Sequence, residues 1–561
     1  MQGTAPGRER AGTEVVRPLQ RGLTVLRAMS RPGREKARPG DLVHATGLAR
    51  STVDRIITTL GRIGYLRFDG QEVALAPPLM ELGNAYLSAG GLSDALADRV
   101  VQLADTFDES VSLAVPDGAD VRFIAQATRR RTMSLAFRIG DALPAERCAP
   151  GALFASAWEE SGWGAWRARR AAGSEEENFP PLPASHTAGT GTEAGFRRRC
   201  RQAGKDGWSL DDQLIEPGLI AVSVPVRDPA GRVACALSVV SHTSRHDAGQ
   251  LAERFLPRLR EAAAGMESAL AAGHQPQASA ATAPEALQDG RGAPAGKGEL
   301  GSGFLQSLAR GLSVLRALGE ARDEGLPLSA LATATGLPRA TARRSLLTLE
   351  ALGYVHCSGR LFRPLPRVLE LGYAHLSGLS FADLVQPHLR QLVDRVHQSA
   401  SVTVLDGEDI QYVARVHTIR IMSVNITLGT RLPAYATAMG RVLLAGLPAV
   451  ERSRVVARSD LRALTPHTVT SAAPLAAVLD EVASKGYAVI DEELEPGLRS
   501  VAVPLRDAHG RVVAALNVAQ HSGSEPAEET RSTLLPLLRL TAAAIERDLR
   551  IAARHHRIRL P

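Results

Sequence analysis

The chain carries the same unit twice, and this repeat limits what it can fold into. Segments of the first half return 289 positions later: Arg21-Gly22-Leu23 as Arg310-Gly311-Leu312, Thr46-Gly47-Leu48 as Thr335-Gly336-Leu337, and Met133-Ser134 as Met422-Ser423. Further along, Glu216-Pro217-Gly218-Leu219 returns as Glu495-Pro496-Gly497-Leu498, 279 positions later. The first copy therefore holds ten extra residues, which we assign to an expanded loop near residues 173–204. A repeat of this length predicts two similarly folded units in tandem.

Two amphipathic helices, with a short helix and a glycine between them, open each copy. The first helix shows an apolar stripe at helical spacing, a short helix ends at Gly47 or Gly336, and a second amphipathic helix follows. The first stripes are Leu19, Leu23, Leu26 and Met29 in copy 1, and Leu308, Leu312, Leu315 and Leu318 in copy 2. A hairpin with a turn at Asp69-Gly70 or Ser358-Gly359 comes next. This order predicts a winged helix-turn-helix, whose second helix enters the major groove of DNA.

The outward face of each second helix is polar and basic. Arginine offers paired donors to guanine or to phosphate, so we predict that these helices and the second wing contact DNA. The predicted DNA-binding residues are Arg50, Ser51, Thr52 and Arg55 in copy 1, and Arg339, Thr341, Arg343, Arg344 and Arg360 in copy 2. Asp54 stands where copy 2 has Arg343, so we expect copy 2 to supply most of the specific affinity. A plain helical hairpin with solvated arginines is the alternative, and the repetition of the whole pattern argues against it.

Helical segments and then alternating strands follow each wing. In copy 2 the expected strand pairs are 401–405 with 410–416 and 500–505 with 512–518, and in copy 1 the last pair is 221–226 with 233–239. Antiparallel hairpins with helices between them predict an α+β sensor domain. The sequence contains no GxSxG elbow, HExxH helix or dinucleotide fingerprint, so we expect no catalytic residues and no cofactor.

The order of these motifs resembles the IclR family of bacterial regulators. The segments that carry the resemblance in copy 2 are ARGLSVLRAL, LATATGLPRATARRSLLTLEALGYV, RVLELGYAHL, TRLPAYATAMGRVLLA, GYAVIDEELEPGLRS and GRVVAALNVAQH. Copy 2 is most similar to regulators of the β-ketoadipate and hydroxybenzoate pathways, and copy 1 resembles the family more loosely. The resemblance implies that each unit combines a winged helix-turn-helix, a linker helix used in dimerisation and a GAF-like effector-binding domain. It also implies control of transcription in response to a small organic acid.

These features together predict the domain organisation of an α+β chain of two tandem units. The expected parts are a disordered N-terminus (1–17), winged helix-turn-helix domains (18–76 and 304–364), linker helices with effector-binding domains (77–270 and 365–550), a flexible linker (271–303) and a basic tail (551–561). The linker is rich in Ala, Gly, Pro, Ser and Gln, as is typical of a tether that would let the two units of one chain pair.

The resemblance implies an effector pocket between the sheet and the loop 435–442. Backbone N–H groups of residues 438–441 would meet a carboxylate, an acidic stretch would border the pocket, and the last strand would add a polar contact. Arg415 or Arg420 could grip the carboxylate, and the sequence leaves open which of them points inward. The candidate effector-binding residues are Arg415, Arg420, Met422, Tyr435, Ala438, Met439, Gly440, Arg441, Asp491 and Asn517.

Copy 1 has lost several of these groups. Gln126, Glu146, Pro150 and Ala152 stand where copy 2 has Arg415, Tyr435, Met439 and Arg441. Glu146 would repel a carboxylate and Pro150 removes one N–H donor, so we expect the first sensor to be mainly structural. The alternative is that it binds a cationic or neutral molecule, which Glu146 would suit.

Composition is compatible with this function. The chain has 561 residues and a formal net charge of +7, which fits a nucleic-acid partner without establishing one. The four cysteines lack metal-site spacing, so we expect reduced thiols and no metal site. We find no run of 18 apolar residues and no apolar leader, and we therefore expect a cytoplasmic protein without membrane contact. The expected partners are operator DNA, a small organic acid and a second copy of the unit. The alternative is a sensor or protein-interaction protein whose DNA binding has degenerated.

Overall fold

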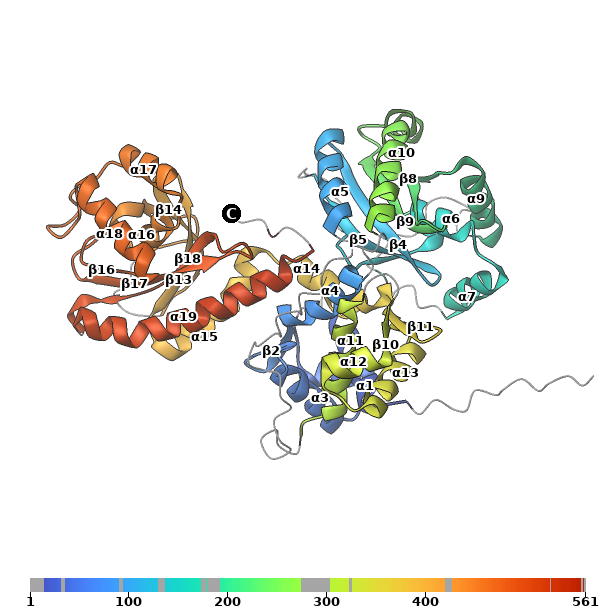
Figure 1. Cartoon of the computed structure of the whole chain (residues 1–561), viewed down its shortest axis with the longest axis horizontal. Coiled ribbons are helices and arrows are strands. Elements are labelled where there is room, and N and C mark those ends of the chain that lie inside the picture. Colours follow the sequence, from blue (N-terminus) through green and yellow to red (C-terminus); the bar gives the residue numbers. More distant parts are fainter. Residues whose placement is uncertain are drawn as a thin grey trace, which may run out of the picture. The chain divides into compact units, whose positions relative to one another are not determined.

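The structure is a computed structural model, and it describes residues 15–31, 36–89, 94–129, 137–172, 179, 192–273, 303–321, 325–418, 426–524, 526–555 and 558. It divides into two compact units, Met1–Gly378 and Leu379–Pro561 (Figure 1). The first unit contains both winged domains and the first sensor domain, and the second unit is the second sensor domain. The division therefore falls inside copy 2, between its winged domain and its sensor domain. Most of the predicted tether and of the expanded loop lies outside the described residues.

Each winged domain has three helices and a three-stranded sheet among its described residues. The first consists of α1 (Arg17–Met29), β1 (Lys36–Ala37), α2 (Pro39–Thr46), α3 (Arg50–Arg62), β2 (Leu66–Asp69) and β3 (Glu72–Leu75). The second consists of α11 (Gln306–Ala317), η3 (Leu318–Glu320), β10 (Leu326–Pro327), α12 (Leu328–Thr335), α13 (Arg339–Ala351), β11 (Val355–Ser358) and β12 (Leu361–Pro364). Gly47 and Gly336 take φ of 66° and 63°, the left-handed conformation that ends the short helix and allows the turn into α3 or α13.

The linkers that follow the two wings differ from each other. Copy 1 has a short 3-10 turn, η1 (Pro77–Leu79), and a helix, α4 (Met80–Ala89). In copy 2 the corresponding segment is η4 (Pro366–Glu370) and the short helix α14 (Tyr373–Ser377). Gly372 separates these two pieces with φ of 96°, which only glycine adopts at little cost, whereas its counterpart Gly83 is helical. The linker helix that the resemblance implies is therefore shortened to α14 and separated from η4 in copy 2.

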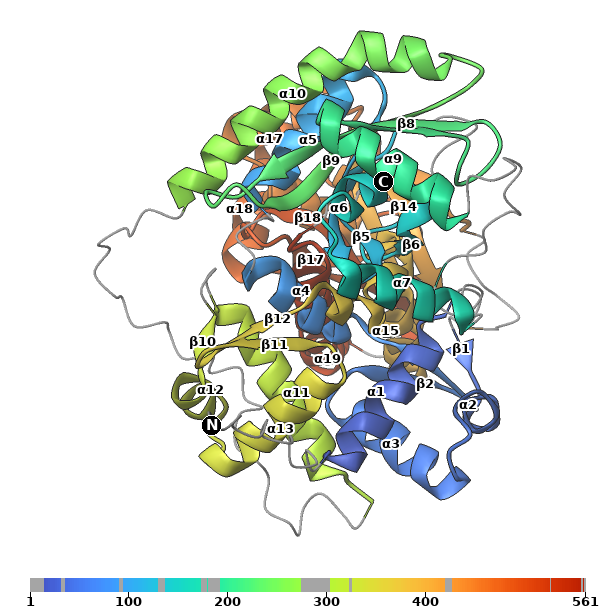
Figure 2. The same ribbon diagram turned by 90° about the vertical axis from the view of Figure 1, so that its right-hand side faces the viewer.

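The two winged domains pack against each other, side by side, within the first unit (Figure 2). Helix α1 lies on α11, and Leu308 contacts Gly22 while Leu19 contacts Gly311. In the repeat, Leu308 is the counterpart of Leu19 and Gly311 is the counterpart of Gly22. The two contacts are therefore equivalent, and a pseudo-two-fold axis relates the winged domains.

Polar contacts repeat the same reciprocity. The amide of Val16 donates to Thr348 Oγ1 over 3.0 Å, and the amide of Leu305 donates to Thr59 Oγ1 over 2.9 Å. Two ion pairs, Arg27 with Glu370 and Arg316 with Glu81, each join nitrogen and oxygen atoms 3.0 Å apart. Within each pair of contacts, the equivalent residues of the two copies are 289 positions apart. The interface therefore follows the repeat in the sequence.

The two sensor domains share one topology. The first consists of α5 (Asp94–Phe107), β4 (Ser110–Asp117), β5 (Asp120–Ala127), β6 (Ala142–Pro144), η2 (Ala145–Arg147), α6 (Ala149–Ala155), α7 (Glu160–Ala171), α9 (Glu193–Asp206), β7 (Ser209–Asp212), β8 (Leu219–Arg227), β9 (Val233–His242) and α10 (Ala248–Gly273). Its antiparallel sheet has the order β6-β5-β4-β9-β8-β7. Helices α5 and α10 cover one face of the sheet, and α6 packs on the other (Figure 1).

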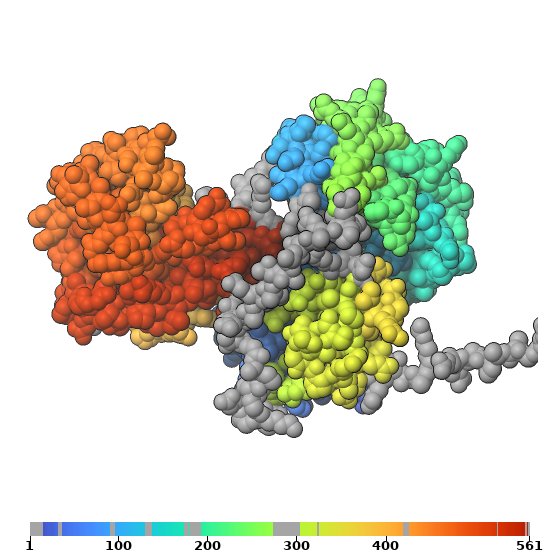
Figure 3. Space-filling view, viewed as in Figure 1, coloured from blue at the N-terminus to red at the C-terminus, as the bar shows by residue number. Residues whose placement is uncertain are grey.

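The second sensor repeats this arrangement in the unit Leu379–Pro561. Its elements are α15 (Phe381–Val396), β13 (Ser399–Asp406), β14 (Asp409–Val416), β15 (Arg431–Pro433), η5 (Ala434–Ala436), α16 (Ala438–Ala445), α17 (Ala449–Arg458), α18 (Ala472–Lys485), β16 (Ala488–Asp491), β17 (Leu498–Arg506), β18 (Val512–His521), η6 (Ser522–Ser524) and α19 (Ala527–Ala552). The sheet order is β15-β14-β13-β18-β17-β16. Helix α19 covers one face of the sheet and forms part of the outer surface of this unit (Figure 3), and α16 packs on the other face.

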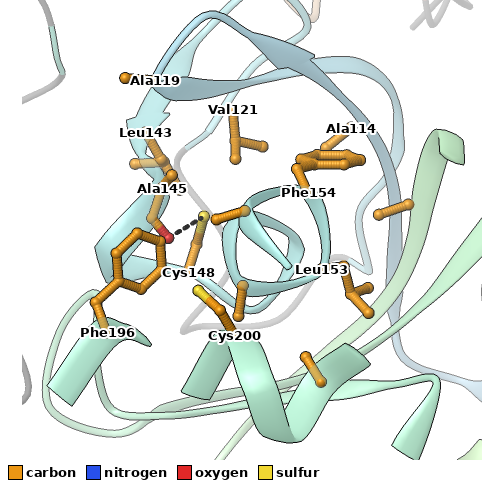
Figure 4. Packing of buried hydrophobic residues seen from close by; sticks show 14 of the residues in the cluster. Ala114, Ala119, Val121, Leu143, Ala145, Cys148, Leu153, Phe154, Phe196 and Cys200 are labelled. Atoms are coloured by element: carbon orange, nitrogen blue, oxygen red, sulfur yellow. Dashed lines mark hydrogen bonds between the residues drawn. The ribbon is translucent and has the colours of Figure 1, made fainter. Parts of the chain in front are cut away.

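The core of the first sensor lies between its sheet and α6. Phe154, Phe196 and the thiols of Cys148 and Cys200 point into this cluster (Figure 4). Cys148 is the N-cap of α6, yet burial raises the pKa of its thiol well above the ordinary value, so it is an unreactive core group. All four cysteines are free thiols, as expected.

Candidate functional site

The second winged domain presents an uncompensated basic helix. Arg339, Arg343 and Arg344 on α13 are exposed, and none of them has an ion pair within the described residues. Thr341 is half-buried on the same helix, and Arg360 is exposed in the turn between β11 and β12. Three exposed guanidinium groups on one helix can bind phosphates and guanine edges of DNA.

The equivalent helix of copy 1 is partly neutralised. Arg50 and Asp54 form an exposed ion pair of 3.6 Å along α3, and Arg55 Nε donates to the carbonyl oxygen of Gly303 over 3.4 Å. Ser51 is exposed and Thr52 is half-buried. An acid beside a DNA-contacting arginine competes with phosphate for it, which lowers the expected contribution of copy 1 to DNA affinity.

A row of polar side chains crosses the sheet of the second sensor. Arg415 lies directly opposite Ser401 in the register of β14 and β13, Ser401 lies opposite Asn517 of β18, and Asn517 lies opposite Ala502 of β17. Residues directly opposite in an antiparallel pair share one face of the sheet. Ala502 belongs to the apolar cluster that packs under α16, so this polar row lies on the α16 face.

The polar row contains groups suited to an anionic ligand. Asn517 is 3% exposed, and its Oδ1 has no hydrogen-bond partner among the described residues. Arg415 Nη1 donates to the carbonyl oxygen of Ile426 over 2.8 Å, and burial lowers the pKa of this guanidinium. A partly desolvated cation is stabilised by a nearby anion, so the row favours a carboxylate.

The segment above this row is helical at the position where the resemblance implied a loop. Residues 438–441 form the first turn of α16, capped by Thr437. The amide of Gly440 donates to Thr437 Oγ1, and the amide of Arg441 donates to the Thr437 carbonyl oxygen. Only the amides of Ala438 and Met439 could therefore meet a ligand, in contrast to the four that the sequence predicted. A helix N-terminus still favours an anion.

Gly440 has a structural reason to be glycine. A Cβ atom at this position would lie 2.1 Å from the carbonyl oxygen of Ala434, and at Gly151 in copy 1 the equivalent distance to Ala145 is 2.0 Å. No side chain fits there, so glycine allows α16 and α6 to approach the preceding 3-10 turn closely.

Arg441 and Tyr435 are already bound to other protein groups. Arg441 is 3% exposed and forms a double ion pair with Glu493, and its Nε donates to the carbonyl oxygen of Tyr435 over 3.0 Å. The hydroxyl of Tyr435 donates to the carbonyl oxygen of Arg462 over 2.9 Å. These contacts tie η5 and α16 to neighbouring segments, and both polar groups already have protein partners.

Asp491 lies on the opposite face of the sheet. It is paired with Arg499 of β17, and the two charged groups are joined by bonds of 2.8 and 3.0 Å. Arg499 also donates to Thr530 of α19, so this pair faces α19. Ile490, the preceding residue, belongs to the cluster under α16. Since neighbouring residues of a strand point to opposite faces, Asp491 does not border the pocket, and this expectation is wrong.

Two predicted residues, Arg420 and Met422, lie outside the described residues. Sequence reasoning also missed three groups on the pocket face: Thr403, Tyr412 and Ser500. The Oγ1 atom of Thr403 is buried and has no hydrogen-bond partner among the described residues. A register shift at Val402/Thr403 places Tyr412 and Arg415 on one face although they are three residues apart. Strict alternation along the sequence does not predict this.

The corresponding face of the first sensor encloses a small cavity of about 20 Å³. Its polar lining comes from Ser112, Gln126, Asp211 and Ser238, and Phe123 and Phe137 stack above the sheet with ring centroids 5.8 Å apart. Asp211 is fully buried, and its Oδ2 and Ser112 Oγ have no hydrogen-bond partner among the described residues. A cavity of this volume has room for about one water molecule.

Glu146 does not have the role that the sequence suggested. It is 3% exposed, accepts a hydrogen bond of 2.9 Å from Trp166 Nε1 and forms an ion pair with Arg169. Its charge is compensated, and it is not part of the cavity lining. The acid that faces the cavity is Asp211, whose pKa burial raises to about 7.

No group of three or more His, Cys, Asp or Glu side chains that could hold a metal occurs in the described part of the chain. A search of the same residues for a helix long and apolar enough to cross a membrane finds none.

Paired winged helix-turn-helix domains, each joined to an α+β domain with a buried polar row, define a ligand-responsive DNA-binding regulator. The chain belongs to the IclR family of bacterial transcriptional regulators. The family's C-terminal domain matches residues 84–267 and 373–547, and the IclR helix-turn-helix domain matches 18–70 and 307–357. Both matches occur twice, as the repeat predicted.

Single-unit relatives match less than half of this chain. The Pca regulon regulatory protein of Pseudomonas putida is 42% identical over 247 residues, which are 44% of this chain and 83% of the relative. The p-hydroxybenzoate hydroxylase transcriptional activator of Acinetobacter baylyi is 34% identical over 244 residues, 43% of this chain and 90% of the relative. The crystal structure of a transcriptional regulator from Rhodococcus sp. RHA1 shows 52% identity, covers 44% of this chain and 99% of that chain, and has a TM-score of 0.43.

Proposed function

We propose that this regulator responds to a small aromatic carboxylate that binds in its second sensor domain. The observation that carries the proposal is the row of Arg415, Ser401 and Asn517 on the sheet face beneath α16. A guanidinium supplies charge and two parallel donors to a carboxylate, and Asn517 adds a buried amide whose Oδ1 has no hydrogen-bond partner among the described residues. Ligand hydroxyl groups would donate to that oxygen.

The relatives support an aromatic acid as the class of effector. Two of them are named for the Pca regulon and for p-hydroxybenzoate hydroxylase. The buried ring of Tyr412 and the side chain of Met439 line the apolar cluster next to the polar row, which suits a benzene ring with one charged end.

The first sensor has a structural role in this proposal. Gln126 replaces Arg415 in its polar row, and Asp211 brings a buried acid to a cavity with room for about one water molecule. A carboxylate placed there would meet a second carboxyl group and no compensating cation among the cavity-lining residues. An amine or a neutral donor is the alternative ligand class for this domain.

The paired winged domains of one chain would read two unlike half-sites on DNA. The reciprocal contacts between α1 and α11 hold the domains in a pseudo-two-fold arrangement, which matches the symmetry of two half-sites on a duplex. The second half-site would be read more strongly because α13 carries three arginines without ion pairs within the described residues. We also infer that the protein acts in the cytoplasm, where its DNA partner lies, and without catalytic turnover.

A thermal-shift experiment on the full chain tests the effector class. Benzoate, 4-hydroxybenzoate, 3,4-dihydroxybenzoate and adipate would be compared with a neutral sugar and an alkylamine. We expect an aromatic carboxylate to raise the melting temperature, because binding only the native state stabilises it. A rise with the sugar or amine and none with any carboxylate would contradict the proposal. A gel-shift experiment with the gene's own upstream DNA tests whether the paired winged domains bind DNA. The absence of any shift would favour a sensor with degenerate DNA binding.

A further inference from the structure

One buried contact lies where the two linkers meet and breaks the equivalence of the two copies. Asn84 of α4 and Tyr373 of α14 are counterparts in the repeat, 289 positions apart, and they contact each other. A residue that meets its own counterpart lies on the pseudo-two-fold axis. The hydroxyl of Tyr373 donates to Asn84 Oδ1 over 3.1 Å, and the two residues are 1% and 2% exposed.

Five other pairs of counterparts at the interface do not distinguish the copies. Each is made by identical residue types in the two halves: Leu19 and Leu308, Gly22 and Gly311, Arg27 and Arg316, Thr59 and Thr348, and Glu81 and Glu370. Two first copies from different chains, or two second copies, could form all of these contacts equally well. Selectivity between the copies therefore has to come from other positions.

The axis position is filled by one large and one small side chain. The ring of Tyr373 lies against Gly83, where a Cβ atom would be 2.2 Å from Tyr373 Cδ2. On the other side, Leu75 and Leu79 of copy 1 lie against Gly372, where a Cβ atom would be 2.9 Å from each. One ring from copy 2 and two leucines from copy 1 thus fill the space around the axis.

Two identical copies would fill this space badly. Two tyrosines would have to share the volume now taken by one ring and one amide, and neither phenol would keep its carbonyl acceptor. Two asparagines would leave the space above Gly83 empty and bury amide groups without the phenol donor. Overpacking, cavities and unsatisfied buried polar groups all destabilise an interface.

The first sensor domain reinforces this preference. Ser377 Oγ of α14 donates to the carbonyl oxygen of Ile139 over 3.2 Å, and Gly140 lies so close to Ala374 that a Cβ atom would be 3.0 Å from its backbone nitrogen. The turn at Gly372 directs α14 to this surface, and the continuous helix α4 has no such turn. The linker of copy 2 is therefore shaped for the place it occupies.

We propose that the Asn84–Tyr373 pair makes this interface selective for one first copy with one second copy, so that the partner of each winged domain is its unlike counterpart. This inference deepens the proposed function, because the DNA-reading pair then always presents two different recognition helices. Selectivity of this kind combines a favourable unlike contact with a penalty on both like contacts.

Cross-linking in the full chain tests the proposal without DNA or effector. All variants carry Cys357→Ser, because Cys357 is the one half-exposed cysteine of the four. The pair Arg27→Cys with Glu370→Cys reports unlike pairing, since these side chains form an ion pair of 3.0 Å. Arg27→Cys with Glu81→Cys reports a pair of first copies, and Arg316→Cys with Glu370→Cys reports a pair of second copies. A short bismaleimide links the thiols, and mass spectrometry identifies the linked peptides.

We expect linked peptides in nearly all of the unlike variant and no two-chain product in either like variant. Adding Tyr373→Asn, which makes the axis residues identical, should reduce the unlike link several-fold and produce two-chain products in the like variants. Asn84→Ala keeps the ring on Gly83 and removes only the acceptor, so it supplies a milder second test with a smaller loss. Circular dichroism checks that each variant folds.

Two-chain products from the like variants with the natural axis pair would overturn the proposal. Unlike linking that is unchanged by both Tyr373→Asn and Asn84→Ala would overturn it as well. Failure of the proposed function has a different signature, because a chain that binds neither DNA nor carboxylate would still show the unlike link.

Discussion

At the scale of single residues, position along a strand decides which groups can meet a ligand. Ile490 packs beneath α16, whereas Asp491, one residue later, faces α19 and pairs with Arg499. The resemblance implied that Asp491 borders the pocket, and the pleat of β16 turns its side chain to the other face. The same principle selects Arg415, because its register opposite Ser401 puts it on the α16 face.

Replacing Arg415 with alanine should weaken binding of an aromatic carboxylate. Loss of a charge-assisted hydrogen-bond partner costs about 1.5–3 kcal/mol, so we expect the Kd for 4-hydroxybenzoate to rise by roughly 10- to 150-fold. Equilibrium dialysis of the full chain measures it. Asp491→Asn is the matched control on the opposite face and should leave the Kd within about twofold. If Asp491→Asn abolishes binding and Arg415→Ala does not, the assignment of the pocket face is wrong.

Asp211 should make the stability of the first sensor depend on pH. Burial raises the pKa of this carboxyl from 3.8 to about 7, so between these values the folded state holds a proton that the unfolded state has released. The free energy of unfolding therefore falls as pH rises through this window and levels off above about pH 7. At roughly 1.4 kcal/mol per pKa unit, the full effect is on the order of 4 kcal/mol.

Tryptophan fluorescence isolates this effect, because all four tryptophans of the chain lie between residues 158 and 208, within the first sensor. Urea unfolding of the full chain at about pH 5 and about pH 8 should show a smaller pH dependence in Asp211→Asn than in the natural protein. Asp212→Asn, an exposed neighbour, is the control. Equal pH dependence in the natural protein and Asp211→Asn would show that the carboxyl does not titrate in this range.

At the scale of elements, the periodic patterns predicted most of the helices and strands. The short helix expected to end at Gly336 is α12, and the expected strand 401–405 lies inside β13. Local side-chain pattern is enough for such elements. The helix at 438–445 was expected in part as a loop, because the resemblance implied a loop at 435–442.

Other features of the elements depend on contacts that are remote in sequence. The register shift at Val402/Thr403, the double ion pair of Arg441 with Glu493, and the break at Gly372 could not be read from local pattern. Each is set by which distant group fills a space or completes a hydrogen bond. The sequence therefore predicted that Arg415 and Asn517 share one face of the sheet only through the resemblance, and the location of the pocket stays a prediction.

The crossing of α1 and α11 should depend on glycine at its centre. A Cβ atom at Gly22 would lie 2.3 Å from Leu308 Cδ1, and at Gly311 it would lie 2.5 Å from Leu19 Cδ2. Both leucines are fully buried, so Gly22→Ala overpacks the interface at a cost of about 1–3 kcal/mol. The melting temperature of the first unit should fall. Gly40→Ala in α2 is the control, because nothing lies within 4 Å of its Cβ position. Equal effects of the two substitutions would contradict the interface.

The two recognition helices should differ in their contribution to DNA binding. Arg343→Ala removes an exposed guanidinium from α13, and we expect a loss of about 1–3 kcal/mol if it contacts a base. Asp54→Ala frees Arg50 on α3 from its ion pair, and we expect tighter binding. Gel-shift titrations with the upstream DNA at one fixed salt concentration measure both. The prediction fails if Arg343→Ala and Arg344→Ala are both silent while Arg55→Ala abolishes binding.

At the scale of the whole molecule, the compact units do not coincide with the two sequence copies. The first unit combines two winged domains and one sensor, and the second unit is a single sensor. A repeat detected in the sequence predicts that two similar folds exist, and it does not predict which of them pack together. In this chain, the residues at the axis and the polar rows of the two sensors differ between the copies, and we propose on this basis that the copies have different roles.

Isothermal titration of the full chain with 4-hydroxybenzoate tests this division of roles most directly, because calorimetry counts sites. One chain should bind one ligand, and Arg415→Ala should weaken that site by roughly 10- to 150-fold while Gln126→Ala leaves its Kd unchanged. Two equivalent sites per chain would contradict the account, as would a single site whose Kd is unchanged by Arg415→Ala, or the absence of binding for this acid, benzoate and 3,4-dihydroxybenzoate alike.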